Sequence, residues 1–198
     1  MLSFGGRVTL EFLKEVVLSE KSQLKYGVTA PFAAWILDSV PGAVHSSVGE
    51  VVQAVSTLSM PIEGKKSLVD SLKSQNIKHD ICAWMTTNLT PDPNYEGKFK
   101  FIFDLETIHD VVKDFPRQHF LDVLNNILHH PKTNQEMSSK VHINLVRAGL
   151  NTAWSNDLLS QLQKLDNDNK NFKLHTLPQA GHWVHIDDLH GLLKLMES

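Results

Sequence analysis

Three short apolar segments that alternate with helical patterns constrain the fold of this 198-residue chain more than any other feature. The segments span residues 33–37, 141–146 and 172–177. A helix between two short apolar strands is the repeating unit of a parallel sheet covered by helices. The sequence therefore predicts an α/β fold with a mostly parallel sheet, and functional side chains are expected at the carboxyl ends of its strands. Because three strands are few for such a sheet, we expect further strands upstream of residue 1.

The helices around these strands are predicted from apolar residues that recur every three or four positions. Two of them span about 155–165 and 189–196, and the polar run 166–171 is expected to be a solvated loop. The first helix follows Gly6, and its inner face is predicted to contain Val8, Leu10, Phe12, Leu13, Val16 and Val17.

Residues from about 44 to 135 carry a mainly helical pattern that prolines interrupt, with a short extended segment expected over 99–104. An insertion of short amphipathic helices between two strands is the usual construction of a lid that covers a site and shapes an apolar pocket. Helical packing with no gating role would give the same pattern, so both interpretations stay open.

The stretch Ser3-Phe4-Gly5-Gly6 stands directly before the first helix. In one interpretation it is a sharp turn that exposes a nucleophilic serine, as in the pattern G-x-S-x-G. Gly5 would then avoid a collision with a facing element, and Gly6 would let the helix pack closely on the sheet. Met1 stands where that pattern has its first glycine. In the other interpretation Ser3 caps the helix.

A histidine, His182, follows the last predicted strand directly, after Ala180 and Gly181. An imidazole titrates near neutrality, so it can accept the proton of a serine hydroxyl and return it to a leaving group. A buried carboxylate is needed to fix its tautomer. Asp38, at the end of the strand 33–37, is the first candidate, although an aspartate before Pro41 also suits the start of a turn.

Four motifs occur in order along the chain: Ser3-Phe4-Gly5-Gly6, Asp38-Ser39-Val40-Pro41, Thr87-Asn88-Leu89 with Phe103-Asp104-Leu105, and Ala180-Gly181-His182-Trp183-Val184-His185. Together they resemble the esterase/lipase-like abhydrolase-domain proteins of the α/β-hydrolase superfamily. The resemblance covers nearly the whole chain. It implies an incomplete α/β-hydrolase domain over residues 1–198, with a helical lid at about 44–135.

The same resemblance implies the site residues. Ser3 would be the nucleophile, His182 the base and Asp38 the acid, with Asp104 as an alternative acid. The backbone N–H of Phe4 would be one oxyanion donor, and the loop with the second donor would precede residue 1.

The implied function is a serine hydrolase that acts on ester or related acyl bonds of a small molecule through a Ser-Asp-His triad. The alternative is a truncated, non-catalytic fragment or interaction protein, which would expose a sheet edge and apolar helix faces. The fold itself does not fix the reaction, since C–C hydrolases, dehalogenases and acyltransferases share this framework.

Composition narrows the partners and the compartment. The formal net charge is -3 and the cations are scattered, so a nucleic-acid partner is not expected. No apolar run is long enough to span a bilayer and no signal peptide is recognisable, which favours an intracellular location, or an organelle if a targeting segment precedes residue 1. The single cysteine, Cys82, is predicted to be a buried structural thiol. Nothing in the sequence constrains the oligomeric state.

No cofactor and no metal are expected. His182, His185 and His190 lie near one another, but neither cysteines nor an H-E-x-x-H pattern accompany them. Trp183 is predicted to pack in the core.

Overall fold

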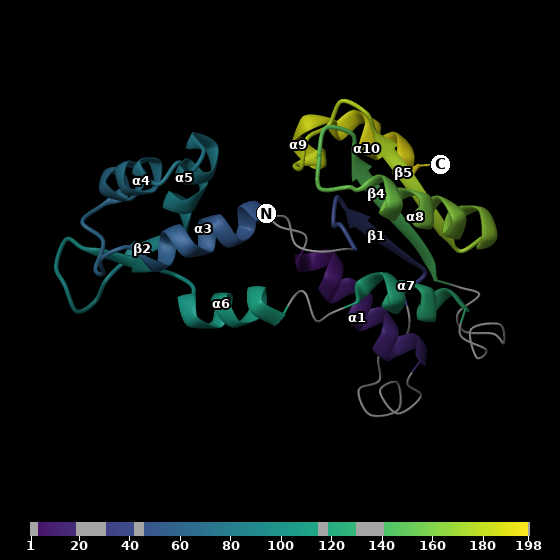
Figure 1. Ribbon diagram of the computed structural model, residues 1–198, viewed down its shortest axis with the longest axis horizontal. Helices are drawn as coiled ribbons and strands as arrows, with labels where there is room; N and C mark the ends of the chain where they lie inside the picture. Colours follow the sequence, from purple (N-terminus) through teal and green to yellow (C-terminus); the bar gives the residue numbers. More distant parts are fainter. Residues whose placement is uncertain (1–3, 19–30, 42–45, 115–118, 130–140, 198) are drawn as a thin grey trace. The chain divides into compact units, whose positions relative to one another are not determined.

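The computed structural model describes residues 4–18, 31–41, 46–114, 119–129 and 141–197, and the chain divides into two units (Figure 1). The first unit contains residues 1–43 and 119–198, and the second contains residues 44–118. The polar composition of residues 19–23 predicts a loop, and these residues lie outside the described ones.

The first unit is built on a parallel sheet of three strands in the order β1-β4-β5. These are β1 (Ala33–Leu37), β4 (His142–Ala148) and β5 (Phe172–Leu177). Both pairs of neighbours are parallel. The predicted parallel sheet is therefore confirmed, and β4 extends two residues beyond its predicted end.

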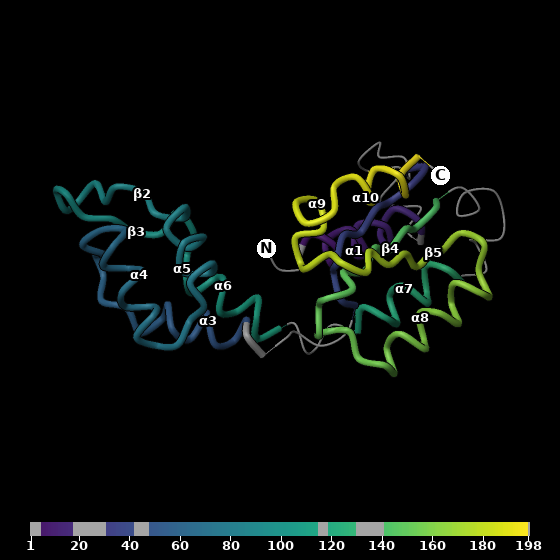
Figure 2. The backbone as a smooth tube through the Cα atoms, turned by 90° about the horizontal axis from the view of Figure 1, so that it is seen from above, coloured from purple at the N-terminus to yellow at the C-terminus, as the bar shows by residue number. Residues whose placement is uncertain are grey.

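Helices cover both faces of this sheet (Figure 2). On one face lie α1 (Phe4–Leu18), α7 (Phe120–His129) and α8 (Asn156–Asp168), which share a buried apolar cluster with the strands. On the other face α9 (Val184–Asp187) and α10 (Leu189–Met196) contribute Val184 and Leu192 to a smaller cluster. Because the three strands are parallel, their carboxyl ends all lie at one edge of the sheet.

The inner face of α1 differs from the prediction in two residues. Leu10, Leu13 and Val16 are buried as expected, whereas Val8 is 50% and Phe12 43% exposed. In a helix, residues 8 and 12 lie on the same face and residue 10 lies nearly opposite them, so the burial of Leu10 leaves Val8 and Phe12 facing away from the core.

The polar run 166–171 was expected to be a solvated loop, and this expectation was wrong for residues 166–168. The helix continues to Asp168, and the side chain of Asp166 is only 5% exposed. Its carboxylate lies 3.0 Å from Lys173 Nζ and accepts a hydrogen bond from the backbone N–H of Leu174. A partner on β5 thus allows the charged side chain to be covered, which local composition cannot reveal.

The second unit is mainly helical. Its elements are α3 (Ser46–Ser56), α4 (Lys65–Ser74), α5 (His79–Met85), the 3-10 turn η1 (Thr86–Asn88), β2 (Leu89–Pro91), β3 (Phe99–Phe101) and α6 (Leu105–Asp114). The strands β2 and β3 form an antiparallel pair. β3 confirms residues 99–101 of the extended segment expected over 99–104, whereas β2 was not predicted.

A separate apolar cluster holds the second unit together, with Leu68, Leu72 and Cys82 almost completely buried. The predicted buried thiol is confirmed, and burial raises the pKa of Cys82. The insertion predicted over about 44–135 covers this unit together with α7, and its role as a lid stays a prediction.

Candidate active site

Asp38 occupies the position directly after β1, where the backbone turns out of the strand. Its φ of 44° lies in the left-handed region, and its N–H donates to Val146 O on β4 at 2.7 Å. Such a backbone costs about 1 kcal/mol or more in a residue other than glycine, so neighbouring contacts must hold it. The side chain is fully buried. The end of β1 therefore carries a residue with a strained backbone and a buried carboxylate.

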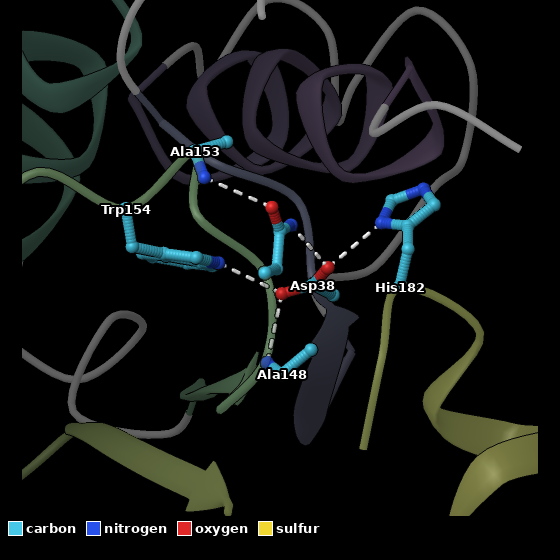
Figure 3. Close-up of polar contacts among 6 residues, drawn as sticks. Asp38, Ala148, Ala153, Trp154 and His182 are labelled. Carbon is cyan, nitrogen blue, oxygen red and sulfur yellow. Dashed lines mark hydrogen bonds and ion pairs between the residues drawn. The ribbon is translucent and has the colours of Figure 1, made fainter. Parts of the chain in front are cut away.

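Four hydrogen-bond partners surround this carboxylate (Figure 3). Oδ1 accepts from the backbone N–H of Ala148 and from Trp154 Nε1, both at 2.8 Å. Oδ2 lies 2.6 Å from Asn151 Nδ2 and 2.7 Å from His182 Nδ1. An ionised carboxylate has about four acceptor sites, so these partners match its full capacity.

The hydrogen-bond network fixes which nitrogen of His182 carries the proton. The backbone N–H of Ala153 can only donate, and it lies 3.0 Å from Asn151 Oδ1. This orients the amide of Asn151 so that its NH₂ group faces Asp38 Oδ2. Asp38 Oδ2 accepts the hydrogen bond from His182, so the facing nitrogen of the ring must donate it. We therefore assign the proton of the neutral ring to Nδ1. Nε2, on the opposite edge of the ring, then carries the lone pair that a general base uses.

The loops after β4 and β5 are tied together beneath His182. Gly149 N donates to Leu177 O at 2.8 Å, and Leu150 N donates to Ala180 O at 3.1 Å. A Cβ on Gly149 would lie 2.4 Å from the backbone oxygen of Pro178, so only glycine permits this approach. The side chain of His182 nevertheless stays 34% exposed, which leaves the ring accessible to a reacting group.

The first turn of α1 packs at the same edge of the sheet. A Cβ on Gly6 would lie 2.3 Å from Ser39 Cβ, which confirms the predicted close packing of helix and sheet. Gly5 was wrongly expected to avoid a collision, since no described atom lies within 4 Å of the position its Cβ would take.

Arg7 strengthens this attachment. Its side chain is buried, Nη2 donates to Val40 O at 3.3 Å, and the guanidinium lies 4.5 Å from the centre of the Phe120 ring. Burial lowers the pKa of the guanidinium. A buried cation with a backbone acceptor and an aromatic face thus links α1 to the segment after β1 and to α7.

Two further site residues, Ser3 and Asp104, were predicted from the sequence. Ser3 lies outside the described residues, and α1 begins at Phe4. Asp104, in the second unit, caps α6: Oδ1 accepts from Glu106 N at 3.0 Å and Oδ2 from Thr107 Oγ1 at 2.9 Å. Among the described residues, Asp38 is therefore the predicted acid that lies in contact with His182.

Sequence reasoning missed Asn151 and Trp154. Both residues follow β4 within a few positions, as Asp38 follows β1. Their position after a parallel strand is the signal that could have identified them. Trp183 was wrongly expected in the core, because it is 37% exposed while the next residue, Val184, is buried.

No group of three or more histidine, cysteine, aspartate or glutamate side chains converges on a common point in the described part of the chain. In the same part, no helix combines the length and the apolar character needed to cross a membrane.

No protein-family model and no curated protein matches the sequence. The chain is similar to solved structures that include a hydrolase and, less closely, a thioesterase domain. The crystal structure of E-2-(acetamidomethylene)succinate hydrolase is 14% identical, with a TM-score of 0.57 over 93% of this chain and 60% of that chain. The thioesterase domain from the curacin biosynthetic pathway is 15% identical, with a TM-score of 0.49 over 94% of this chain and 63% of that chain. The chain thus spans less than two thirds of the length of either structure.

Proposed function

Because the chain has the α/β-hydrolase fold that its motifs predicted, we propose that it carries the acid–base site of a serine hydrolase. Its substrate would be a small molecule with an ester or related acyl bond. The observation that carries the proposal is the 2.7 Å contact between His182 Nδ1 and the buried carboxylate of Asp38. That contact leaves Nε2 as the proton acceptor, which is the tautomer a serine nucleophile requires.

In the proposed mechanism, Ser3 Oγ attacks the acyl carbonyl carbon while His182 Nε2 takes the hydroxyl proton. The tetrahedral oxyanion accepts a hydrogen bond from the backbone N–H of Phe4. Collapse of the intermediate expels the leaving group, which takes the proton from Nε2, and a water molecule then releases the acyl group by the same steps. Asp38 stays ionised and stabilises the imidazolium.

The location of the first turn of α1 supports Ser3 as the nucleophile. Gly6 and Arg7 hold this turn against Ser39 and Val40, directly after the acid. The serine precedes that turn in sequence. The positive end of the helix dipole at this turn would also favour a developing negative charge.

We further propose that the second unit acts as a lid. What supports this is its place in the chain, since residues 44–118 are inserted between β1 and α7 of the first unit. Replacement of residues 46–114 by a short Gly/Ser linker should keep reactivity toward a small probe and abolish discrimination between acyl chain lengths. Unchanged discrimination would contradict the lid.

The alternative function, a non-catalytic interaction protein, is favoured by one observation. Apolar side chains on α9 and α10 are widely exposed: Ile186 is 67%, Leu189 53%, Leu193 48% and Met196 42% exposed. Leu189, Leu193 and Met196 follow one another at intervals of four and three residues on α10, which places them on one surface of that helix, and Ile186 lies on α9. Exposed apolar side chains of this kind suit a surface that another segment covers.

Labelling with a fluorophosphonate probe separates the two functions. We expect weak labelling of this 198-residue chain and strong labelling of a version extended before residue 1 by a segment that supplies a second oxyanion donor. Both signals should disappear in Ser3→Ala and fall strongly in His182→Ala. Labelling that survives Ser3→Ala would remove Ser3 from the mechanism. A folded longer form that does not label at all would favour the interaction protein.

A further inference from the structure

We propose that Asn151 and Trp154 are positioning residues that orient the carboxylate of Asp38 and, through it, the ring of His182. This inference rests on the proposed hydrolase function. Neither residue would touch a substrate or a reacting atom. Their role would be to keep the protonated Nδ1 on Asp38 and the lone pair of Nε2 directed away from it.

The two residues act on different oxygens of the same carboxylate. Trp154 Nε1 donates to Oδ1 at 2.8 Å, and Asn151 Nδ2 donates to Oδ2 at 2.6 Å (Figure 3). Rotation about the last torsion of an aspartate is soft, so one or two donors leave it a range of orientations. Donors on both oxygens, added to the N–H of Ala148, restrict that rotation and leave one direction of Oδ2 for His182.

The loop that presents these donors is itself held at both ends. Asn151 N donates to Ala148 O at 3.3 Å, and Asn151 Oδ1 accepts from Ala153 N at 3.0 Å. Ser155 then caps α8 by accepting from Leu158 N. Trp154 is 5% exposed and belongs to the main core cluster. A donor with a fixed backbone and a packed ring loses little entropy when it binds the carboxylate.

The strain at Asp38 makes these donors necessary. An aspartate without supporting contacts would leave the left-handed backbone conformation that Asp38 adopts, because other conformations are lower in energy. Burial of a carboxylate that lacks hydrogen-bond partners is also costly. Trp154 and Asn151 supply two of its four partners, from a loop that begins after the neighbouring strand. The position of His182 therefore depends on residues that it does not contact in any described hydrogen bond.

The test compares Trp154→Phe and Asn151→Leu with the matched control Asn169→Leu. Asn169 makes the same two kinds of bond: its amide NH₂ donates to Leu128 O at 3.0 Å, and its carbonyl accepts from Asn171 N at 2.9 Å. The control therefore loses similar hydrogen bonds in the first unit without affecting Asp38. Trp154→Phe keeps an aromatic ring and removes only the N–H donor and the extra ring volume.

The first measurement uses the 198-residue chain with ¹⁵N-labelled histidine. In the unmodified chain we expect His182 to show a hydrogen-bonded, slowly exchanging Nδ1 proton and an unprotonated Nε2. This Nδ1 signal should broaden or disappear in Trp154→Phe and Asn151→Leu, and stay unchanged in Asn169→Leu. Equal signals in all three variants, at a similar loss of thermal stability, would overturn the positioning role.

The second measurement is the labelling rate of the form that reacts with the fluorophosphonate. Loss of one hydrogen bond to a charged group should slow labelling about tenfold in each site variant, whereas the control keeps its rate. In an Asp38→Asn background neither substitution should slow labelling further, because both act through that carboxylate. Additive losses would overturn the proposal. If no form labels, the hydrolase function fails, and the Nδ1 signal alone decides whether the two residues position His182.

Discussion

Two aspartates that the sequence offers as the acid, Asp38 in the first unit and Asp104 in the second, have opposite surroundings. Asp38 is fully buried, and its side-chain partners lie more than a hundred residues away in the chain. Asp104 accepts its hydrogen bonds from Glu106 and Thr107, within three residues. The first carboxylate connects loops from different strands, and the described hydrogen bonds of the second lie at the start of its own helix.

The difference shows that a motif match does not predict which aspartate will form hydrogen bonds with distant residues. A carboxylate directly before a helix finds hydrogen-bond donors in the first turn of that helix, so its acceptor oxygens are satisfied without any distant residue. A carboxylate after a parallel strand meets the ends of neighbouring strands, and there it can orient a second functional group. Four predictions test this contrast, from the largest expected effect to the smallest.

Asp38→Asn should have the largest effect. An amide cannot accept from four donors, so we expect labelling of the reactive form to fall by about 10³- to 10⁴-fold, as for the same change in a serine protease triad. Unfolding of the 198-residue chain in urea should show a loss of about 3 kcal/mol. Asp104→Asn serves as the control. A labelling rate that falls more in the control than in Asp38→Asn would exchange the roles of the two residues.

Gly6→Ala tests whether the first turn of α1 is held at the same strand end as Asp38. The added methyl group would lie 2.3 Å from Ser39 Cβ, so the free energy of unfolding should fall by about 2 kcal/mol. Gly5→Ala is the matched control: its methyl group meets no described atom, and alanine should stabilise the helix by about 0.5–1 kcal/mol. Opposite signs in denaturation curves support the packing, and equal effects contradict it.

Asp104→Ala should affect only the second unit. Loss of the cap is expected to lower the stability of α6 by about 1 kcal/mol, which hydrogen exchange of residues 105–114 would report. The labelling rate of the reactive form should stay unchanged. A large fall in labelling, without a fall in stability, would make Asp104 part of the catalytic site.

His175 tests whether another ionisable group depends on distant partners in the first unit. Its ring stacks on Trp35, Nε2 lies 2.9 Å from Asn144 Oδ1, and burial, with a smaller effect of Lys173, lowers its pKa. The folded state therefore prefers the neutral ring, and stability should fall as the pH drops below about 6.5, the value of an unfolded histidine. His175→Gln should flatten this part of the stability curve. A curve of unchanged slope would show that the ring does not titrate with unfolding.

Much of the first unit followed from local pattern. The segments 33–37 and 172–177 are strands with the predicted bounds, and 189–196 is a helix as expected. Short apolar runs between helical patterns leave few other arrangements, because each strand must be covered on both faces. Local pattern failed at Asp166, which was predicted to lie in a solvated loop. Its partners Lys173 and Leu174 on β5 cover the side chain, and these contacts do not appear in the local sequence pattern.

The sequence by itself determined the fold class and put Asp38 and His182 among the candidates, because position after a parallel strand depends only on pattern and chain order. Only the tertiary structure decided which of the aspartates meets the imidazole. It also revealed Asn151 and Trp154, since hydrogen bonds across more than a hundred residues depend on strand order and register. Those two properties arise from packing of the whole sheet and are not encoded in any short stretch of the chain.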